Sequence, residues 1–187
     1  MGSIMRSCTS LLSIFLFVLL GCGQPGAVDY GFTIKNVSIS QAYQSLNVHL
    51  RQDLQLSQQA REALEHGVTL IIMLKLELKN DNNMMIVRKE DRNFQLRYLP
   101  LSERYQLLEE GTDELRAFSR LRHLLASIND LNIQMTTGPL LPGNYELRTR
   151  IHLDESRLPT PMQLPAWFSP QWQHDSEWSV WPFEINV

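Results

Sequence analysis

The sequence predicts a mainly β protein of the α+β class, with an antiparallel β-sandwich-like core, two short α-helices and a Pro/Trp-rich C-terminal loop. Several segments alternate apolar and polar residues with a period of two, which is typical of half-buried strands. Two segments begin with residues that favour helix starts. All four tryptophans and five of the nine prolines lie after residue 158, which predicts an irregular C-terminal segment.

Two strands and a short helix open the folded part of the chain. Residues 30–51 are expected to form two strands joined near Gln41. Their apolar positions are Phe32, Ile34, Val37, Ile39, Leu46, Val48 and Leu50. Ser57 can cap a helix that runs through Glu65, and Gly67 can end it in the left-handed conformation, which glycine adopts without strain.

A long antiparallel hairpin is expected next. One face of its first strand is apolar throughout, at Val68, Leu70, Ile72, Leu74, Leu76 and Leu78. The other face carries Ile71 and Met73 before it turns polar, so only the first half of the strand is expected to be covered on both faces. Asp81-Asn82-Asn83 is a turn signal, and Phe94-x-Leu96-x-Tyr98 marks the second strand. Tyr105-x-Leu107 continues the meander.

The second helix is expected from Thr112 to about Ile128. Thr112 can cap its start, and Asp113 and Glu114 lie where acidic side chains interact favourably with the helix dipole. One stripe of this segment is apolar at helical spacing. Another face carries Arg116, Arg120 and His123.

The C-terminal third is expected to contain a strand, a loop and a final strand. Pro142-Gly143-Asn144 introduces a strand from Tyr145 to Leu153, whose outward residues are Glu146, Arg148, Arg150 and His152. Residues 155–176 are expected to be an ordered loop without a regular helix, because proline lacks the backbone N–H, and residues 177–187 a last strand. The tryptophan rings are expected to pack over the sheet, with an exposed sugar-binding platform as the alternative.

The first 21 residues have the parts of a bacterial lipoprotein signal peptide in the usual order. Arg6 precedes the apolar run Leu11–Leu20, and Leu19-Leu20-Gly21 leads to Cys22. A lipoprotein peptidase needs such a thiol to carry the diacylglyceryl group, so Cys22 is the expected site of lipid attachment.

Residues 22–28 are then a tether and residues 29–187 a single domain. Cleavage after Gly23 is the alternative to lipidation, whereas an uncleaved anchor is disfavoured because the apolar run is shorter than the roughly 20 residues that cross a bilayer. Gly23 stands where retention in the inner membrane usually requires Asp. We therefore expect the periplasmic side of the outer membrane, or the soluble periplasm if no lipid is added.

The composition argues against a nucleic-acid partner and against a disulfide in the mature domain. Removal of residues 1–21 takes away one arginine and no acidic residue, so the net charge falls from −3 to −4, which argues against nucleic acid. Only Cys22 remains of the two cysteines, so the mature domain is expected to have no disulfide and to depend on packing.

No motif in the sequence reaches the specificity of a catalytic or metal site. Glu109-Glu110, Asp113-Glu114 and Asp175-x-Glu177 are explained better as caps and turns than as acid/base pairs. The five histidines are scattered, without the spacing of a helical zinc site. His174-Asp175-Ser176 has the residue types of a triad but lacks the glycine-flanked serine. We expect no enzymatic activity, no metal and no cofactor.

Met84, Met85, Ile86 and Val87 form the first candidate contact site, because they directly follow the turn signal at the hairpin tip. Exposed apolar residues at such a position mark a protein or membrane contact. The alternative is that the tip folds back on the core.

Arg148, Arg150 and His152 form the second candidate, a basic patch that Arg116 and Arg120 could extend. Such a patch would bind a carboxylate or phosphate group of a partner. The alternative is an ordinary solvated strand face.

Three C-terminal motifs carry a family resemblance. They are Asp154-x-Ser156-Arg157-Leu158-Pro159-x-Pro161, Ala166-Trp167-Phe168-Ser169-Pro170-x-Trp172 and Ser176-x-Trp178-x-x-Trp181-Pro182-Phe183. Through them the chain resembles the bacterial DUF4390 family over roughly residues 30–183. The resemblance implies an exported proteobacterial protein without an assigned activity, catalytic residue or cofactor, and an association with sensor histidine kinases. The lipobox cysteine and Met84-Met85-Ile86-Val87 depart from the family pattern.

The expected function is a non-catalytic interaction module of the envelope that binds another envelope protein, with a sensor kinase as the partner that the resemblance implies. The alternative is a small-ligand protein with a pocket of roughly 300 Å³ or more beneath Trp167 and Trp172. A hydrolase comes third and would need convergent carboxylates.

The lipid anchor has a direct test. We expect Cys22→Ser to move the protein from the membrane fraction to the soluble periplasmic fraction, because the substitution removes the acylated thiol. Immunoblotting of separated fractions measures this, and an unchanged distribution would refute lipid attachment.

Overall fold

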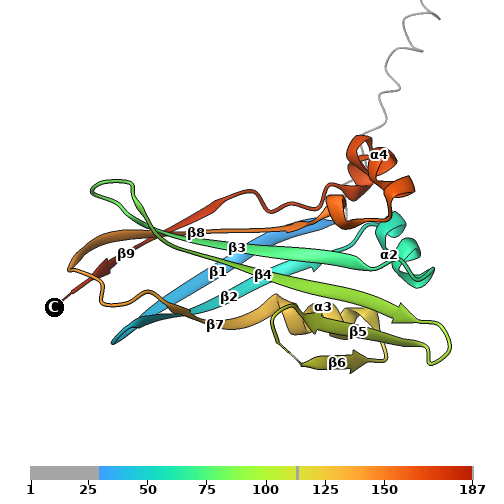
Figure 1. The fold of residues 1–187 in the computed structure, drawn as a ribbon, viewed down its shortest axis with the longest axis horizontal. Coiled ribbons are helices and arrows are strands. Elements are labelled where there is room, and N and C mark those ends of the chain that lie inside the picture. The colour runs from blue at the N-terminus through green and yellow to red at the C-terminus, as the bar shows by residue number, and fades with distance from the viewer. Residues whose placement is uncertain (1–29, 113, 187) are drawn as a thin grey trace, which may run out of the picture.

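Two antiparallel sheets lie face to face in the computed structural model, which describes residues 30–112 and 114–186 (Figure 1). The smaller sheet has the strand order β1-β2-β7 and consists of β1 (Gly31–Ala42), β2 (Ser45–Gln55) and β7 (Asp130–Thr136). The predicted mainly β, α+β class is confirmed. The expected signal peptide, Cys22 and the tether lie outside the described residues.

The larger sheet has the order β6-β5-β4-β3-β8-β9. Its strands are β3 (Leu70–Asn80), β4 (Ile86–Leu99), β5 (Arg104–Glu109), β6 (Leu115–Phe118), β8 (Gly143–Leu153) and β9 (Ser179–Ile185). The helices are α2 (Gln58–Glu65), α3 (Leu121–Asn129) and α4 (Thr160–Phe168), with short 3-10 turns η1 (Glu155–Arg157) and η2 (Pro170–Trp172). No helix in the described ranges is long and apolar enough to span a bilayer.

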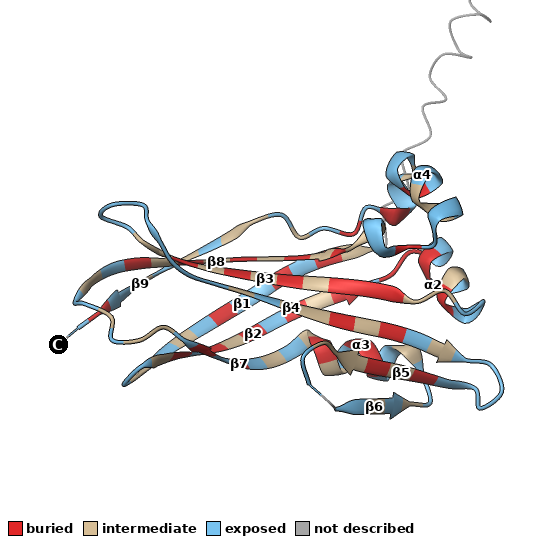
Figure 2. Cartoon of the chain, viewed as in Figure 1, coloured by how far each residue is buried: buried red, intermediate tan, exposed pale blue. Residues whose placement is uncertain are grey.

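The centre of the core is β3, which lies between β4 and β8 (Figure 2). Its inward residues are fully buried, as the alternation predicts: Leu70, Ile72, Leu74, Leu76 and Leu78. On the other face Ile71 is buried, whereas Met73, Lys75 and Glu77 are all partly exposed. The strand is therefore covered on both faces over a shorter stretch than the sequence predicts. Burial of each such leucine contributes about 1.5–3 kcal/mol.

Helix α2 has the start and the end that the sequence predicts. The Ser57 hydroxyl accepts a hydrogen bond from the Ala60 N–H over 3.1 Å, which satisfies a donor that the helix leaves free. Gly67 follows the helix with a φ of 90°, a conformation that favours glycine.

The expected helix from Thr112 to Ile128 is wrong in its first half. Residues 115–118 form the edge strand β6, and α3 begins only at Leu121. The Thr112 hydroxyl donates to the Glu109 carbonyl in a turn instead of capping a helix. Leu115, one of the apolar residues of the expected helix, is exposed, because this segment pairs with β5 as an edge strand.

The C-terminal segment also differs from the expectation, because α4 is a helix inside the predicted loop. Pro161 lies in its first turn, where an N–H would have no partner within the helix. Pro165 removes one further hydrogen bond, which a helix of nine residues held by packing tolerates. The sequence also missed β7, because its apolar residues follow the α3 stripe without a break.

The tryptophans occupy different environments and form no common platform. Trp172 is buried against the core, and the Trp181 indole N–H donates to the Thr149 hydroxyl over 3.1 Å. Trp178 lies under the Arg148 guanidinium, whereas Trp167 is half exposed on α4. The predicted packing role is therefore met by Trp172 and Trp181.

Substitution of two of these tryptophans tests the assignment. Trp172→Ala should lower the free energy of unfolding by about 3–5 kcal/mol, because it leaves a cavity in the core. Trp167→Ala should cost under about 1 kcal/mol, since its ring is half exposed. Urea unfolding measures both, and equal losses would contradict the difference in packing.

Candidate functional site

The hairpin tip, residues 84–87, is exposed as an interface requires. The exposed fractions of Met84, Met85, Ile86 and Val87 are 60%, 64%, 43% and 40%. Met84 has a φ of 54°, and the Asn80 N–H donates to the Met85 carbonyl across the loop. The hairpin tip therefore does not fold back on the core, which was the alternative prediction.

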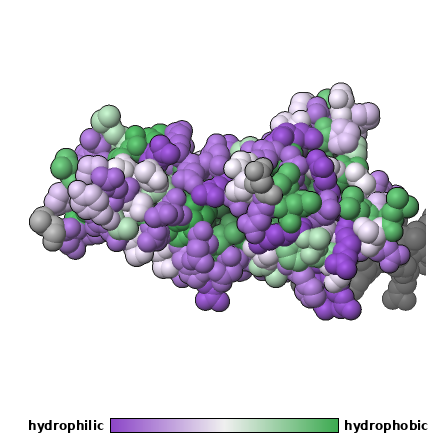
Figure 3. All heavy atoms as spheres, turned by 60° about the horizontal axis from the view of Figure 1, so that its bottom comes forward, coloured by the Kyte–Doolittle hydropathy of each residue, from purple (hydrophilic) through white to green (hydrophobic). Residues whose placement is uncertain are grey.

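Two other loops place apolar side chains at the same end of the sandwich. Tyr43 in the β1–β2 turn and Leu141 in the β7–β8 loop are both highly exposed. The β7–β8 loop contacts the β1–β2 turn, since the Thr137 and Gly138 N–H groups donate to the Gln44 carbonyl. Figure 3 shows apolar patches on this left-hand end of the molecule.

The strand that follows the tip has a free edge. β5 pairs with β4 only over residues 94–99, so residues 86–92 have β3 on one side and no strand on the other within the described chain. These residues are exposed on both faces, apart from partly exposed Glu90 and Arg92. A free edge next to exposed apolar residues can accept a strand from another protein.

The basic patch is brought together on β8, but its charges are already engaged. Arg150 donates from Nε and Nη2 to the Asp175 carboxylate, with the Nε to Oδ1 distance at 2.9 Å. Arg148 stacks 5.0 Å from the Trp178 ring centroid. Burial, followed by the Lys75 and Arg150 charges, lowers the pKa of His152, so this imidazole is neutral at pH 7.

Arg116 and Arg120, which could have extended that patch, lie far from it. Arg116 is on β6, and β5, β4 and β3 separate this edge strand from β8. The described residues also contain no group of three His, Cys, Asp or Glu side chains that could hold a metal ion.

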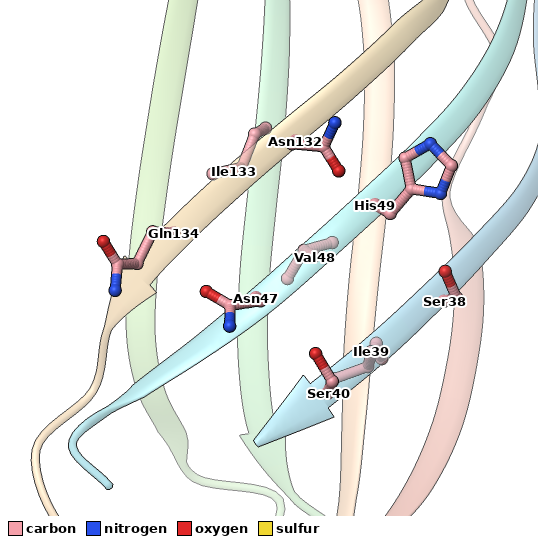
Figure 4. Close-up of a pocket in the computed structure, with 9 residues that line it drawn as sticks. All are labelled: Ser38, Ile39, Ser40, Asn47, Val48, His49, Asn132, Ile133 and Gln134. Atoms are coloured by element: carbon pink, nitrogen blue, oxygen red, sulfur yellow. The ribbon is translucent and has the colours of Figure 1, made fainter. Parts of the chain in front are cut away.

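A shallow hollow of about 320 Å³ lies on the outer face of the smaller sheet (Figure 4). Its polar side chains form two rows across β1, β2 and β7: Ser38, His49 and Asn132, then Ser40, Asn47 and Gln134. The His49 Nε2 lies 2.7 Å from Asp130 Oδ1, which occupies that ring nitrogen. Such rows of polar side chains are typical of a strand face in contact with solvent, and they do not suggest a catalytic site.

A second pocket, the Trp167 pocket, has a volume of about 420 Å³. It lies where the end of β8, η1, α4 and the segment 173–175 meet. Residues that line it include Arg150, His152, Asp154, Glu155, Trp167 and Asp175. This pocket exceeds the predicted size of roughly 300 Å³ and is lined by Trp167. Trp172, the other predicted lining residue, is buried in the core and does not line it.

The Trp167 pocket carries more acidic than basic groups. Burial raises the pKa of Glu155, and the neighbouring Asp154 and Asp175 raise it further. Burial also raises the pKa of Asp175, but the hydrogen bonds from Arg150 and from the Glu177 N–H outweigh this effect and the net shift is downward. The Asp175 carboxylate is therefore ionised at pH 7.

Sequence reasoning did not single out Asp154, Glu155 or Trp167 as members of one site. The pocket forms because Asp175 pairs with His152 in an isolated antiparallel bridge, which brings residues about twenty positions apart together. No spacing in the sequence encodes this bridge. The one signal was the acidic pair that precedes the proline-rich segment.

One ion pair fastens η1 to the larger sheet. Arg157 Nη2 lies 2.8 Å from Glu110 Oε1, and Gln95 and Asn93 also donate to this carboxylate. The hydrogen bonds from Arg157, Gln95 and Asn93 lower the pKa of Glu110 to about 2. The expected solvated turn at Glu109-Glu110 is instead a hydrogen-bonded junction.

This junction predicts a pH dependence. Because the Glu110 pKa falls from 4.5 to about 2 on folding, its stabilising effect is present above about pH 5 and is lost as the pH falls towards 2. Glu110→Gln should therefore lower the Tm at pH 7 and reduce the difference in Tm between pH 7 and pH 3. Calorimetry of both proteins measures this, and equal acid dependence would contradict it.

Comparison with known proteins gives a family and no named relative. Residues 29–182 match the family described as "Domain of unknown function (DUF4390)". No curated protein and no solved structure matches the chain. Since the match covers most of the 187 residues, the chain belongs to the DUF4390 family.

Proposed function

We propose that the protein is a non-catalytic interaction module of the bacterial envelope that binds a protein partner through the hairpin tip. The supporting observation is the projection of four exposed apolar residues, Met84 to Val87, from a hairpin whose distal part is exposed on both faces. Burial of these four side chains against a partner would be favourable by about 25 cal/mol per Å² of apolar surface removed from water. Exposed clusters of this kind mark contact sites.

The free edge of β4 favours a protein over a lipid surface as the partner. Residues 86–92 present backbone N–H and C=O groups that a strand of a partner can pair with, whereas lipid hydrocarbon cannot. The charges on either side of the tip are mixed, with Asp81 before it and Arg88 and Lys89 after it. A polar rim around an apolar centre is typical of protein interfaces.

The proposed location rests on the sequence alone. Lipidation of Cys22 would hold the domain on the periplasmic side of the outer membrane, and cleavage after Gly23 would leave it soluble in the periplasm. An envelope protein is then the partner within reach. The family resemblance suggests the periplasmic sensor domain of a histidine kinase.

A crosslinking experiment tests the partner. A photoreactive amino acid at Met84 should give a discrete protein adduct in intact cells, identified by mass spectrometry. The matched control is Leu101, which is fully exposed in the β4–β5 turn at the other end of the molecule. Adducts to lipid alone, or the same adducts from both positions, would overturn the proposal.

Substitutions then test the surface with the identified partner. Met84→Ser with Met85→Ser should weaken binding at least tenfold without lowering the Tm, and Leu101→Ser should change neither quantity. The N–H groups of Lys89 and Glu90 point to opposite sides of β4, one towards β3 and the other towards the free edge. Proline at the position whose N–H faces the free edge should block strand addition and leave the β3 pairing intact, so one of Lys89→Pro and Glu90→Pro should have this effect. Unchanged affinity in all of these variants would refute the surface.

A further inference from the structure

We propose that the Trp167 pocket binds a small organic cation, through an ammonium group placed between Trp167 and the carboxylates of Asp154 and Glu155. The site is independent of the hairpin tip, which lies at the opposite end of the sandwich (Figure 1). Failure of one proposal therefore leaves the other standing.

The size of the pocket fits a small molecule. Its volume of about 420 Å³ is within the range of 300–1,000 Å³ that small-ligand sites occupy. Elements distant in sequence form the walls and are fastened together: the Asp154 N–H donates to the Ile71 carbonyl, and the Leu153 N–H donates to the His174 carbonyl. The site is thus held by the sheet and not by a free loop.

The charge of the pocket selects a cation. Three carboxylates, Asp154, Glu155 and Asp175, line it, and the one guanidinium in the lining, Arg150, is already paired with Asp175. Asp154 uses Oδ1 to accept from the Ser156 N–H and hydroxyl. The Glu155 carboxylate has no hydrogen bond or ion pair within residues 30–112 and 114–186. An anion would meet repulsion from these carboxylates.

Two of the three carboxylates that line the pocket, those of Asp154 and Glu155, lie on its η1 side. The charges of Lys75 on β3 and Arg150 on β8 lower the pKa of His152, while Asp175 and Asp154 raise it. The charges that act on Glu155 are all acidic, those of Asp154 and Asp175. A bound cation would relieve this repulsion between carboxylates. The favoured place for a positive group is therefore beside Glu155 and away from Arg150.

The half-exposed Trp167 distinguishes an organic cation from a metal ion. An indole ring attracts ammonium groups by a cation–π interaction and covers the apolar carbon atoms attached to them. A bare metal ion needs several oxygen or nitrogen ligands around one point, and no group of three such side chains is found in the described residues. Aromatic ring and unpaired carboxylate together match an alkylammonium.

Titration calorimetry of the full-length protein with choline and with putrescine tests the proposal. At least one of these amines should bind saturably at millimolar or lower concentration. Trp167→Ala and Glu155→Gln should each weaken that binding by about fivefold or more, in line with the usual strength of a cation–π contact or a partly buried ion pair.

Matched controls make the outcome decisive. Phe168→Ala removes a neighbouring aromatic on α4 that is 84% exposed and does not line the pocket, and Glu184→Gln removes an exposed acid on β9. Neither should change the affinity. No saturable binding of either amine, equal weakening in the controls, or calcium binding that Glu155→Gln abolishes while the amines do not bind would each overturn the proposal.

Discussion

A single buried histidine joins the helix, the sheet and the C-terminal segment. The Ser57 N–H donates to His174 Nε2 over 2.9 Å, so the other ring nitrogen, Nδ1, carries the proton and donates to the Trp172 carbonyl. Burial lowers the pKa of this imidazole and keeps it neutral at pH 7. Its own carbonyl accepts from the Leu153 N–H at the end of β8. Protonation would set two N–H groups against each other, so the packing of α2, η2 and the wall of the Trp167 pocket depends on the neutral ring.

The two sheets differ in width, and α3 compensates for the difference. Three strands face six, so part of the inner side of the larger sheet needs another cover. Helix α3 contacts β5 and β6 there, with Leu124, Leu125 and Ile128 buried. The hairpin tip lies beyond the residues of β4 that pair with β5, and its apolar residues are exposed.

The parts of the fold that were predictable are those with a strict period. The face of β3 from Leu70 to Leu78 and the inward face of β8 follow from alternation, and α2 follows from Ser57 and Gly67. Residues 115–118 were wrongly predicted to be helical, because their pairing with β5 outweighs the local helix signals. The position of residues 84–87 after a turn allowed an exposed hairpin tip and a tip folded back on the core, and only the structure decides for exposure. The Trp167 pocket depends on the His152 to Asp175 bridge, a contact without a local signature.

Strand β8 runs the length of the sandwich from one candidate site to the other. Its first residues lie beside the hairpin, where the Asp81 N–H donates to the Asn144 carbonyl, and its last residues form the pocket wall. Eleven residues at about 3.3 Å each separate the two sites by about 35 Å. The two sites therefore do not overlap, so the chain has room for a partner at the hairpin tip and a small ligand in the pocket at the same time.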